Sequence, residues 1–174
     1  MRFVGRGNIQ AACVVEHDVG AQRKRRGLAR GPDDLYSGCG MVTKDDVEGF
    51  LDRLAVDGAH HEEIQPGMWL VRPGGELDAD VVVHYSPPVV LLRLKVMDLP
   101  KNERALATLS RRLLQLNASE LVHGSYGIEG DAVVLTEALE LSHLDYEEFL
   151  ASYESMTLAL ASHLRELAPY REVH

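Results

Sequence analysis

The stretch 81–139 constrains the fold more than any other part of the chain, because it predicts two strands, a helix and two further strands in succession. Residues 81–85 and 89–97 are rich in β-branched and apolar side chains, which suit a pleated sheet. Pro87-Pro88 separates the two runs, since proline cannot donate a ladder hydrogen bond. In the later half of the second run, charged and apolar residues alternate, which predicts a strand with one solvent-facing side.

A helix and a hairpin are expected in the remainder of this stretch. Leucines between 102 and 117 recur at spacings of three and four, which predicts a helix with one apolar face, and Asn117 is expected to end it. Residues 121–128 and 132–139 then predict two strands. Gly130 lies between them and supplies the positive φ that a tight hairpin needs.

The flanking segments predict two more helices and one more strand. Thr43 is a helix N-cap candidate, and the helix after it is expected to end near Asp57-Gly58. The strand 68–72 follows the turn at Pro66-Gly67. A long final helix starts after Asp145 and is expected to stop at Pro169, and its apolar stripe fits either a core or a dimer interface. The predicted class is therefore α+β: helix, three strands, helix, two strands, long helix.

Residues 1–40 differ from the rest in composition and charge. They hold seven Lys/Arg and four Asp/Glu, which gives +3, whereas residues 41–174 hold eleven and twenty-three, which gives −12. We expect a disordered or loosely ordered basic leader over 1–40 and a folded domain over 41–174. The basic run 22–26 could instead be an arm for nucleic acid. A third alternative is that Met41 is the natural start and that 1–40 is an over-long gene model.

Composition narrows the function classes. An acidic domain repels nucleic acid and is compatible with basic protein partners, so nucleic-acid binding is not expected of 41–174. No apolar run is long enough to span a membrane, and no signal peptide is evident, so we expect a cytoplasmic protein. Cys13 and Cys39 are expected to be free thiols, as is usual in the cytosol.

No catalytic or metal-binding constellation has local support. Adjacent His60 and His61 would point to opposite sides of an extended segment and no third ligand accompanies them, so a solvated loop or the start of a strand is expected there. Ser125 lies in a motif one residue short of the nucleophile elbow, within a predicted strand. His143 and His163 are single and are expected at the surface or at an edge. We therefore predict no metal, no cofactor and no enzymatic activity.

The C-terminal half resembles the YbjN-domain family, whose fold is similar to that of the CesT-type chaperones of type III secretion. The matching features are Asn117 before the hairpin, Tyr126-Gly127 in its first strand and Gly130-Asp131 at its turn. Pro66-Gly67-Met68-Trp69 resembles the family's first hairpin. The resemblance covers about residues 41–167 and not the first forty residues.

This resemblance implies a homodimer built on a twisted antiparallel sheet backed by helices, with no catalytic activity. Secretion chaperones of this fold hold an extended segment of another protein against apolar patches and strand edges. For YbjN-like proteins a regulatory role is often inferred. The resemblance therefore implies a protein partner, whose identity the sequence does not give.

The leading hypothesis is a protein-binding module, chaperone-like or regulatory. The residues predicted to contact a partner lie in two strands and in the helix 102–117, and they are Trp69, Val89, Leu91, Leu106 and Leu113. Trp69 is most simply a core residue and otherwise the wall of a binding groove. The alternative is a small-ligand-binding or enzymatic domain whose pocket gathers dispersed residues such as His84, Tyr85 and His123.

Overall fold

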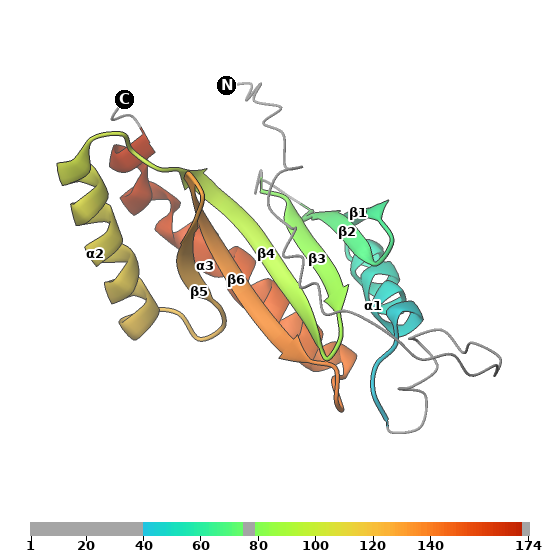
Figure 1. Ribbon diagram of the computed structural model, residues 1–174. Coiled ribbons are helices and arrows are strands. Elements are labelled where there is room, and N and C mark those ends of the chain that lie inside the picture. The colour runs from blue at the N-terminus through green and yellow to red at the C-terminus, as the bar shows by residue number, and fades with distance from the viewer. Residues whose placement is uncertain (1–39, 75–78, 172–174) are drawn as a thin grey trace, which may run out of the picture.

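The computed structural model describes residues 40–74 and 79–171, and Figure 1 traces how they are arranged. The basic run 22–26, Cys13, Cys39 and all but the last residue of the expected leader lie outside the described residues.

The elements follow the predicted order with one additional strand. They are α1 (Lys44–Val56), β1 (His60–Gln65), β2 (Met68–Arg72), β3 (Val81–Ser86), β4 (Val89–Asp98), α2 (Glu103–Ser119), β5 (Ser125–Glu129), β6 (Ala132–Glu140) and α3 (Tyr146–Arg171). The α+β class is confirmed. The additional strand is β1, where a loop or a strand start was expected. All of its residues but one are exposed, so its sequence has no alternation of apolar and polar residues that could have predicted a strand. Its hydrogen-bonded pairing with β2 makes it a strand.

The six strands form one antiparallel sheet in the order β1-β2-β3-β4-β6-β5. β4 is central and pairs with β3 on one side and β6 on the other, so α2 and β5 lie between β4 and β6 in sequence but not in the sheet. The register aligns buried residues across the strands. One row is Trp69, Val83 and Leu92, and the next is Val71, Val81, Leu94, Leu135 and Tyr126.

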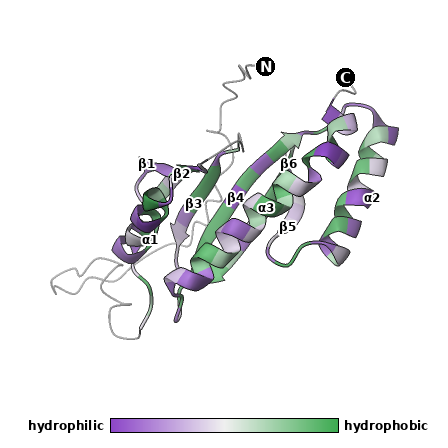
Figure 2. Cartoon of the chain, turned by 180° about the vertical axis from the view of Figure 1, so that it is seen from behind, coloured by the Kyte–Doolittle hydropathy of each residue, from purple (hydrophilic) through white to green (hydrophobic). Residues whose placement is uncertain are grey.

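These rows lie on the face that α1 and α3 cover. Figure 1 shows both helices behind the sheet, and Figure 2, seen from behind, shows them in front of it. α1 contributes Val47, Leu51 and Leu54 to the core, and α3 contributes Phe149, Met156, Leu160 and Leu167 among others. α2 lies beside the β5 edge and buries Leu109, Leu113 and Leu116. All three helices therefore leave the opposite face of the sheet uncovered.

The helix caps follow the sequence, whereas three element boundaries do not. Thr43 and Asp46 form the expected capping box at α1. α3 continues to Arg171 through Pro169, because a proline in the last turn removes only one hydrogen bond of the helix. α2 extends past Asn117 to Ser119, and β5 begins at Ser125 rather than at 121. Asn117 lies inside the helix, and its side chain bonds to the backbone of β5.

Two buried tyrosines provide a matched test of the packing. The Tyr153 hydroxyl is buried without a hydrogen-bond partner, whereas the Tyr126 hydroxyl is 2.8 Å from Nδ1 of His163. We expect Tyr153→Phe to leave the free energy of unfolding unchanged or higher, and Tyr126→Phe to lower it by about 1 kcal/mol. Urea denaturation measures both values. A larger loss in Tyr153→Phe than in Tyr126→Phe would contradict the packing described here.

Candidate protein-binding surface

The uncovered face of the sheet presents an apolar patch over β2, β3 and β4. Alternation along each strand sends every second side chain to this face, and the register places Leu70 beside Val82, and Leu91 beside His84. We call the apolar members the open-face patch, and they are Met68, Leu70, Val82, Val89 and Leu91. Each is half-buried, because neighbouring side chains on the same face shield it although no helix does.

His84 lies within the open-face patch, in register with Met68 on one side and Leu91 on the other. Burial lowers the pKa of His84, and the positive charge of Arg93 lowers it further. The ring is therefore neutral at physiological pH. Arg93 itself is paired with Glu129 at 2.9 Å. The patch is thus an uncharged surface, and the cation beside it is already paired.

The structure separates the five predicted contact residues. Val89 and Leu91 lie together on the uncovered face. Trp69 lies on the opposite face with no exposed area, so it is a core residue and reaches no partner unless the core opens. Leu106 is half-buried on α2 and Leu113 is 4% exposed there. The residues that sequence reasoning missed are Met68, Leu70 and Val82, and the alternation 68, 70, 72 that buries Trp69 could have identified the first two.

One edge of the sheet is closed by a side chain. Nδ2 of Asn117 donates to the carbonyl of Tyr126 at 3.0 Å, and the Tyr126 amide donates to Oδ1 of Asn117 at 2.8 Å. Asn117 thus satisfies both backbone groups that Tyr126 turns away from β6. Since α2 packs along this edge as well, another strand cannot pair with β5 at Tyr126.

The other edge has no such cover. β1 pairs with β2 alone among the described strands, and Ile64 is 42% exposed. A bulge between Glu63 and Gln65 precedes the turn. Glu63 holds this turn by accepting from Lys44 and from the Gly67 amide, and the hydrogen bond from Lys44 is the main cause that lowers the pKa of Glu63. β1 is therefore an ordered strand with an available edge.

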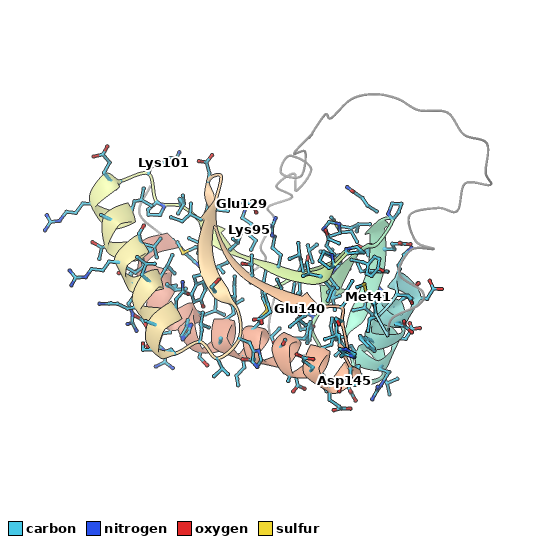
Figure 3. The ribbon with its side chains drawn as sticks, turned by 60° about the horizontal axis from the view of Figure 1, so that its bottom comes forward. Met41, Lys95, Lys101, Glu129, Glu140 and Asp145 are labelled. Carbon is cyan, nitrogen blue, oxygen red and sulfur yellow. The ribbon has the colours of Figure 1, made fainter. Side chains whose placement is uncertain are left out.

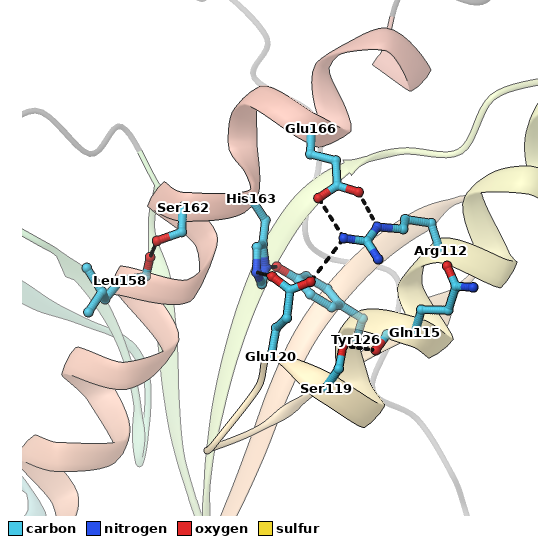
Figure 4. Close-up of polar contacts among 9 residues, drawn as sticks. All are labelled: Arg112, Gln115, Ser119, Glu120, Tyr126, Leu158, Ser162, His163 and Glu166. Atoms are coloured by element: carbon cyan, nitrogen blue, oxygen red, sulfur yellow. Dashed lines mark hydrogen bonds and ion pairs between the residues drawn. The ribbon is translucent and has the colours of Figure 1, made fainter.

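Polar contacts fix α2 against α3 and β5 (Figure 4). Arg112 of α2 bonds to both carboxylate oxygens of Glu166 on α3 and, at 3.0 Å, to Glu120. Nε2 of His163 is 3.3 Å from Glu120, and its Nδ1 meets the Tyr126 hydroxyl. The expectation that His163 lies at the surface is wrong: it is 5% exposed, because it belongs to the core-facing side of α3.

The residues of the alternative pocket do not converge. His84 and Tyr85 are neighbours on β3 and point to opposite faces of the sheet. His123 contacts Ser152 on α3 at 3.4 Å and Glu137 at 3.7 Å, on the helix-covered side. His84 and His123 are therefore on different faces. Within 40–74 and 79–171, no three His, Cys, Asp or Glu side chains lie close enough together to hold a metal ion.

The closed edge generates a mutational prediction. We expect Asn117→Ala to lower the free energy of unfolding by about 1–3 kcal/mol, because it leaves the Tyr126 N–H and C=O without partners. Ser119→Ala is the matched control, since its hydroxyl bonds only to the carbonyl of Gln115 in the same helix. Urea denaturation gives the two values, and amide exchange at Tyr126 should accelerate in Asn117→Ala alone. Equal stability of the two variants would argue against the closed edge.

Among the described residues, no helix combines the length and the apolar character that crossing a membrane requires.

Comparison with solved structures identifies related folds. The chain is similar to YbjN of E. coli, a putative transcription regulator, with 18% identity and a TM-score of 0.53 over 72% of this chain and 96% of that one. It is also similar to a chain of the heterodimeric ExoU–SpcU complex from the type III secretion system of Pseudomonas aeruginosa. There the identity is 16% and the TM-score 0.51, over 68% of this chain and 94% of that one. At these identities the likeness shows a shared fold.

The family comparison covers most of the domain. No curated protein matches the sequence. The model of the CesT_Tir_1 family matches residues 41–172, which lie within the expected domain 41–174. The chain therefore belongs to the CesT_Tir_1 family of CesT/YbjN-type chaperone proteins.

Proposed function

We propose that this protein is a non-catalytic protein-binding module, chaperone-like or regulatory, that acts in the cytoplasm. It associates as a homodimer and holds an extended segment of another protein. The single observation that supports this best is the open-face patch, an uncharged apolar surface that none of the described helices covers. Family membership supports it as well, since the ExoU–SpcU structure is a complex of two different proteins.

The energetics favour binding at this face. Full burial of a Val or Leu side chain contributes about 1.5–3 kcal/mol, and the half-buried members of the patch have part of that still to gain. A partner that covers the half-buried Val89 and Leu91 would therefore gain about 1.5–3 kcal/mol before any polar contact forms. The neutral state of His84 removes the cost of burying a charge there.

The available edge gives a second contribution. An extended segment that pairs with β1 would satisfy backbone groups that β1 otherwise exposes to water, and main-chain pairing tolerates many partner sequences. Alternate side chains of that segment would then lie beside Glu62 of β1, which is itself in register with Leu70 of the open-face patch. The β1 edge and the open-face patch are thus neighbouring parts of one sheet face, on which we place the partner segment.

A pair of charge substitutions tests this function. We expect Val89→Asp with Leu91→Asp to weaken homodimer formation and partner binding at least about a hundredfold, because both carboxylates would have to be buried. Sedimentation equilibrium measures the dimer, and quantitative mass spectrometry of tagged protein purified from its native host measures the partner.

The matched control is Val56→Asp with Leu158→Asp, which makes the same chemical change at exposed positions on α1 and α3. Circular dichroism and thermal unfolding establish that both double variants fold. If the open-face variant dimerises and recovers the same partner as the control, this face is not the binding surface and the proposal fails.

A further inference from the structure

The Lys and Arg side chains without a partner among the described residues gather at one part of the domain. Among the described residues, most Lys and Arg side chains bond to an acidic residue or, for Arg171, to the Val96 carbonyl. The four remaining cations have no partner within the described residues, and they are Lys101, Arg104, Arg111 and Arg165. All four lie on α2, directly before it, or in the last turns of α3.

The first turns of α2 are basic although the domain is acidic. Residues 101–112 hold four Lys/Arg and one Glu, which gives +3, within a domain that totals −12. Figure 3 shows Lys101 at the start of α2, far from Met41 and Asp145 at the other end of the sheet. Unpaired like charges repel one another and so raise the free energy of the isolated chain. Binding of an opposite charge relieves this repulsion and lowers the free energy.

A groove runs between the unpaired cations. It has a volume of about 410 Å³ and is lined by Asn102, Arg104, Ala105 and Thr108 of the α2 end and by Pro169 and Tyr170 of α3. Arg111 lies seven residues after Arg104 and therefore on the same side of α2. Arg165 lies one turn before Pro169 on α3. Cations thus border the groove on both helices.

The groove itself offers apolar rather than polar contacts. Oδ1 of Asn102 is occupied by the Ala105 amide at 3.1 Å, and the Thr108 hydroxyl donates to the Arg104 carbonyl at 2.9 Å. What remains available is the surface of Ala105, Pro169 and Tyr170 together with the guanidinium of Arg104, which bonds to none of the described residues. Such a lining suits an aliphatic or aromatic side chain flanked by carboxylates.

The groove is held in shape before any ligand binds. Arg112 ties α2 to α3 through both oxygens of Glu166, two turns from Ala105 along α2. Because the helices are already fixed, a ligand does not have to order them, and less of its binding energy is lost.

We propose that this groove binds an acidic segment of the partner protein, inserting one apolar side chain between α2 and α3 while its carboxylates pair with Arg104, Arg111 and Arg165. The inference rests on the proposed protein-binding function and adds a second contact, on a surface separate from the open-face patch. It assigns the partner a chemical character: an apolar residue within a run of Asp or Glu.

The test uses a fluorescein-labelled peptide, Asp-Glu-Phe-Glu-Asp, and fluorescence anisotropy on the full chain. We expect saturable binding that weakens as salt is added, and weaker binding of the peptide in which Ser replaces Phe. Arg104→Glu with Arg111→Glu should weaken binding about tenfold or more. Arg53→Glu with Arg72→Glu, the same change of net charge at the α1–β2 end, should leave it unchanged.

Five results would overturn the inference. The first is no saturable binding of the acidic peptide, and the second is equal loss in the two double variants. In the third, labelled oligothymidylate binds more tightly than the peptide and competes for it, which assigns the site to nucleic acid. In the fourth, the peptide binds only after removal of residues 172–174, which assigns the groove to the chain's own end. Peptide binding lost in Val89→Asp with Leu91→Asp but kept in Arg104→Glu with Arg111→Glu would likewise overturn it, while leaving the proposed function intact.

Discussion

The pairing of β4 with β6 is the constraint on which the rest of the structure depends. It runs from Val89 opposite Glu140 to Asp98 opposite Ala132, and it joins the N-terminal part of the sheet to the C-terminal hairpin. A slip of one residue would exchange the two faces of β4, sending Leu92 and Leu94 to solvent and Arg93 into the core. The same register that buries the core rows therefore also places Leu91 and Val89 on the uncovered face. Core formation and the binding surface are thus set by one interaction.

One edge of this sheet is covered and the other is not, and this difference favours binding of a partner strand at β1. Asn117 and α2 close β5, while β1 at the other edge has only β2 as its neighbour among the described strands. The network of Arg112, Glu120 and Glu166 keeps α2 in place, so the closed edge stays closed. Available backbone and uncovered apolar side chains are found together at the β1 side. The groove between α2 and α3 lies beyond the closed edge, so a segment bound there would not compete for β1.

Sequence reasoning succeeded where burial imposed a pattern and failed where it did not. The apolar run 89–97 predicted β4, and the alternation in its later half predicted that Arg93 and Lys95 face solvent. The first half shows no alternation, so the sequence did not place Val89 and Leu91 on the uncovered face. The leucine spacing predicted α2. β1 escaped prediction because its residues are almost all exposed, so no periodicity marks it. Asn117 and His163 each bond to Tyr126, which lies on another element, and one sequence does not reveal such a contact between elements. Trp69 was placed among the contact residues because tryptophan is enriched at interfaces, although its parity with Val71 assigns it to the core.

The central claim is that the described residues leave the open-face patch uncovered and that a second protein molecule, another copy of the chain or the partner, covers it. Solvent paramagnetic relaxation of the Val89 and Leu91 methyl groups, measured by NMR with a soluble gadolinium chelate, tests this most directly. In a dilute sample with the mass of a monomer, the account predicts strong relaxation of both methyl groups, which falls as the protein concentration rises and dimers form. If both were protected in the monomeric sample, the chain itself would cover the face, and the account would be contradicted.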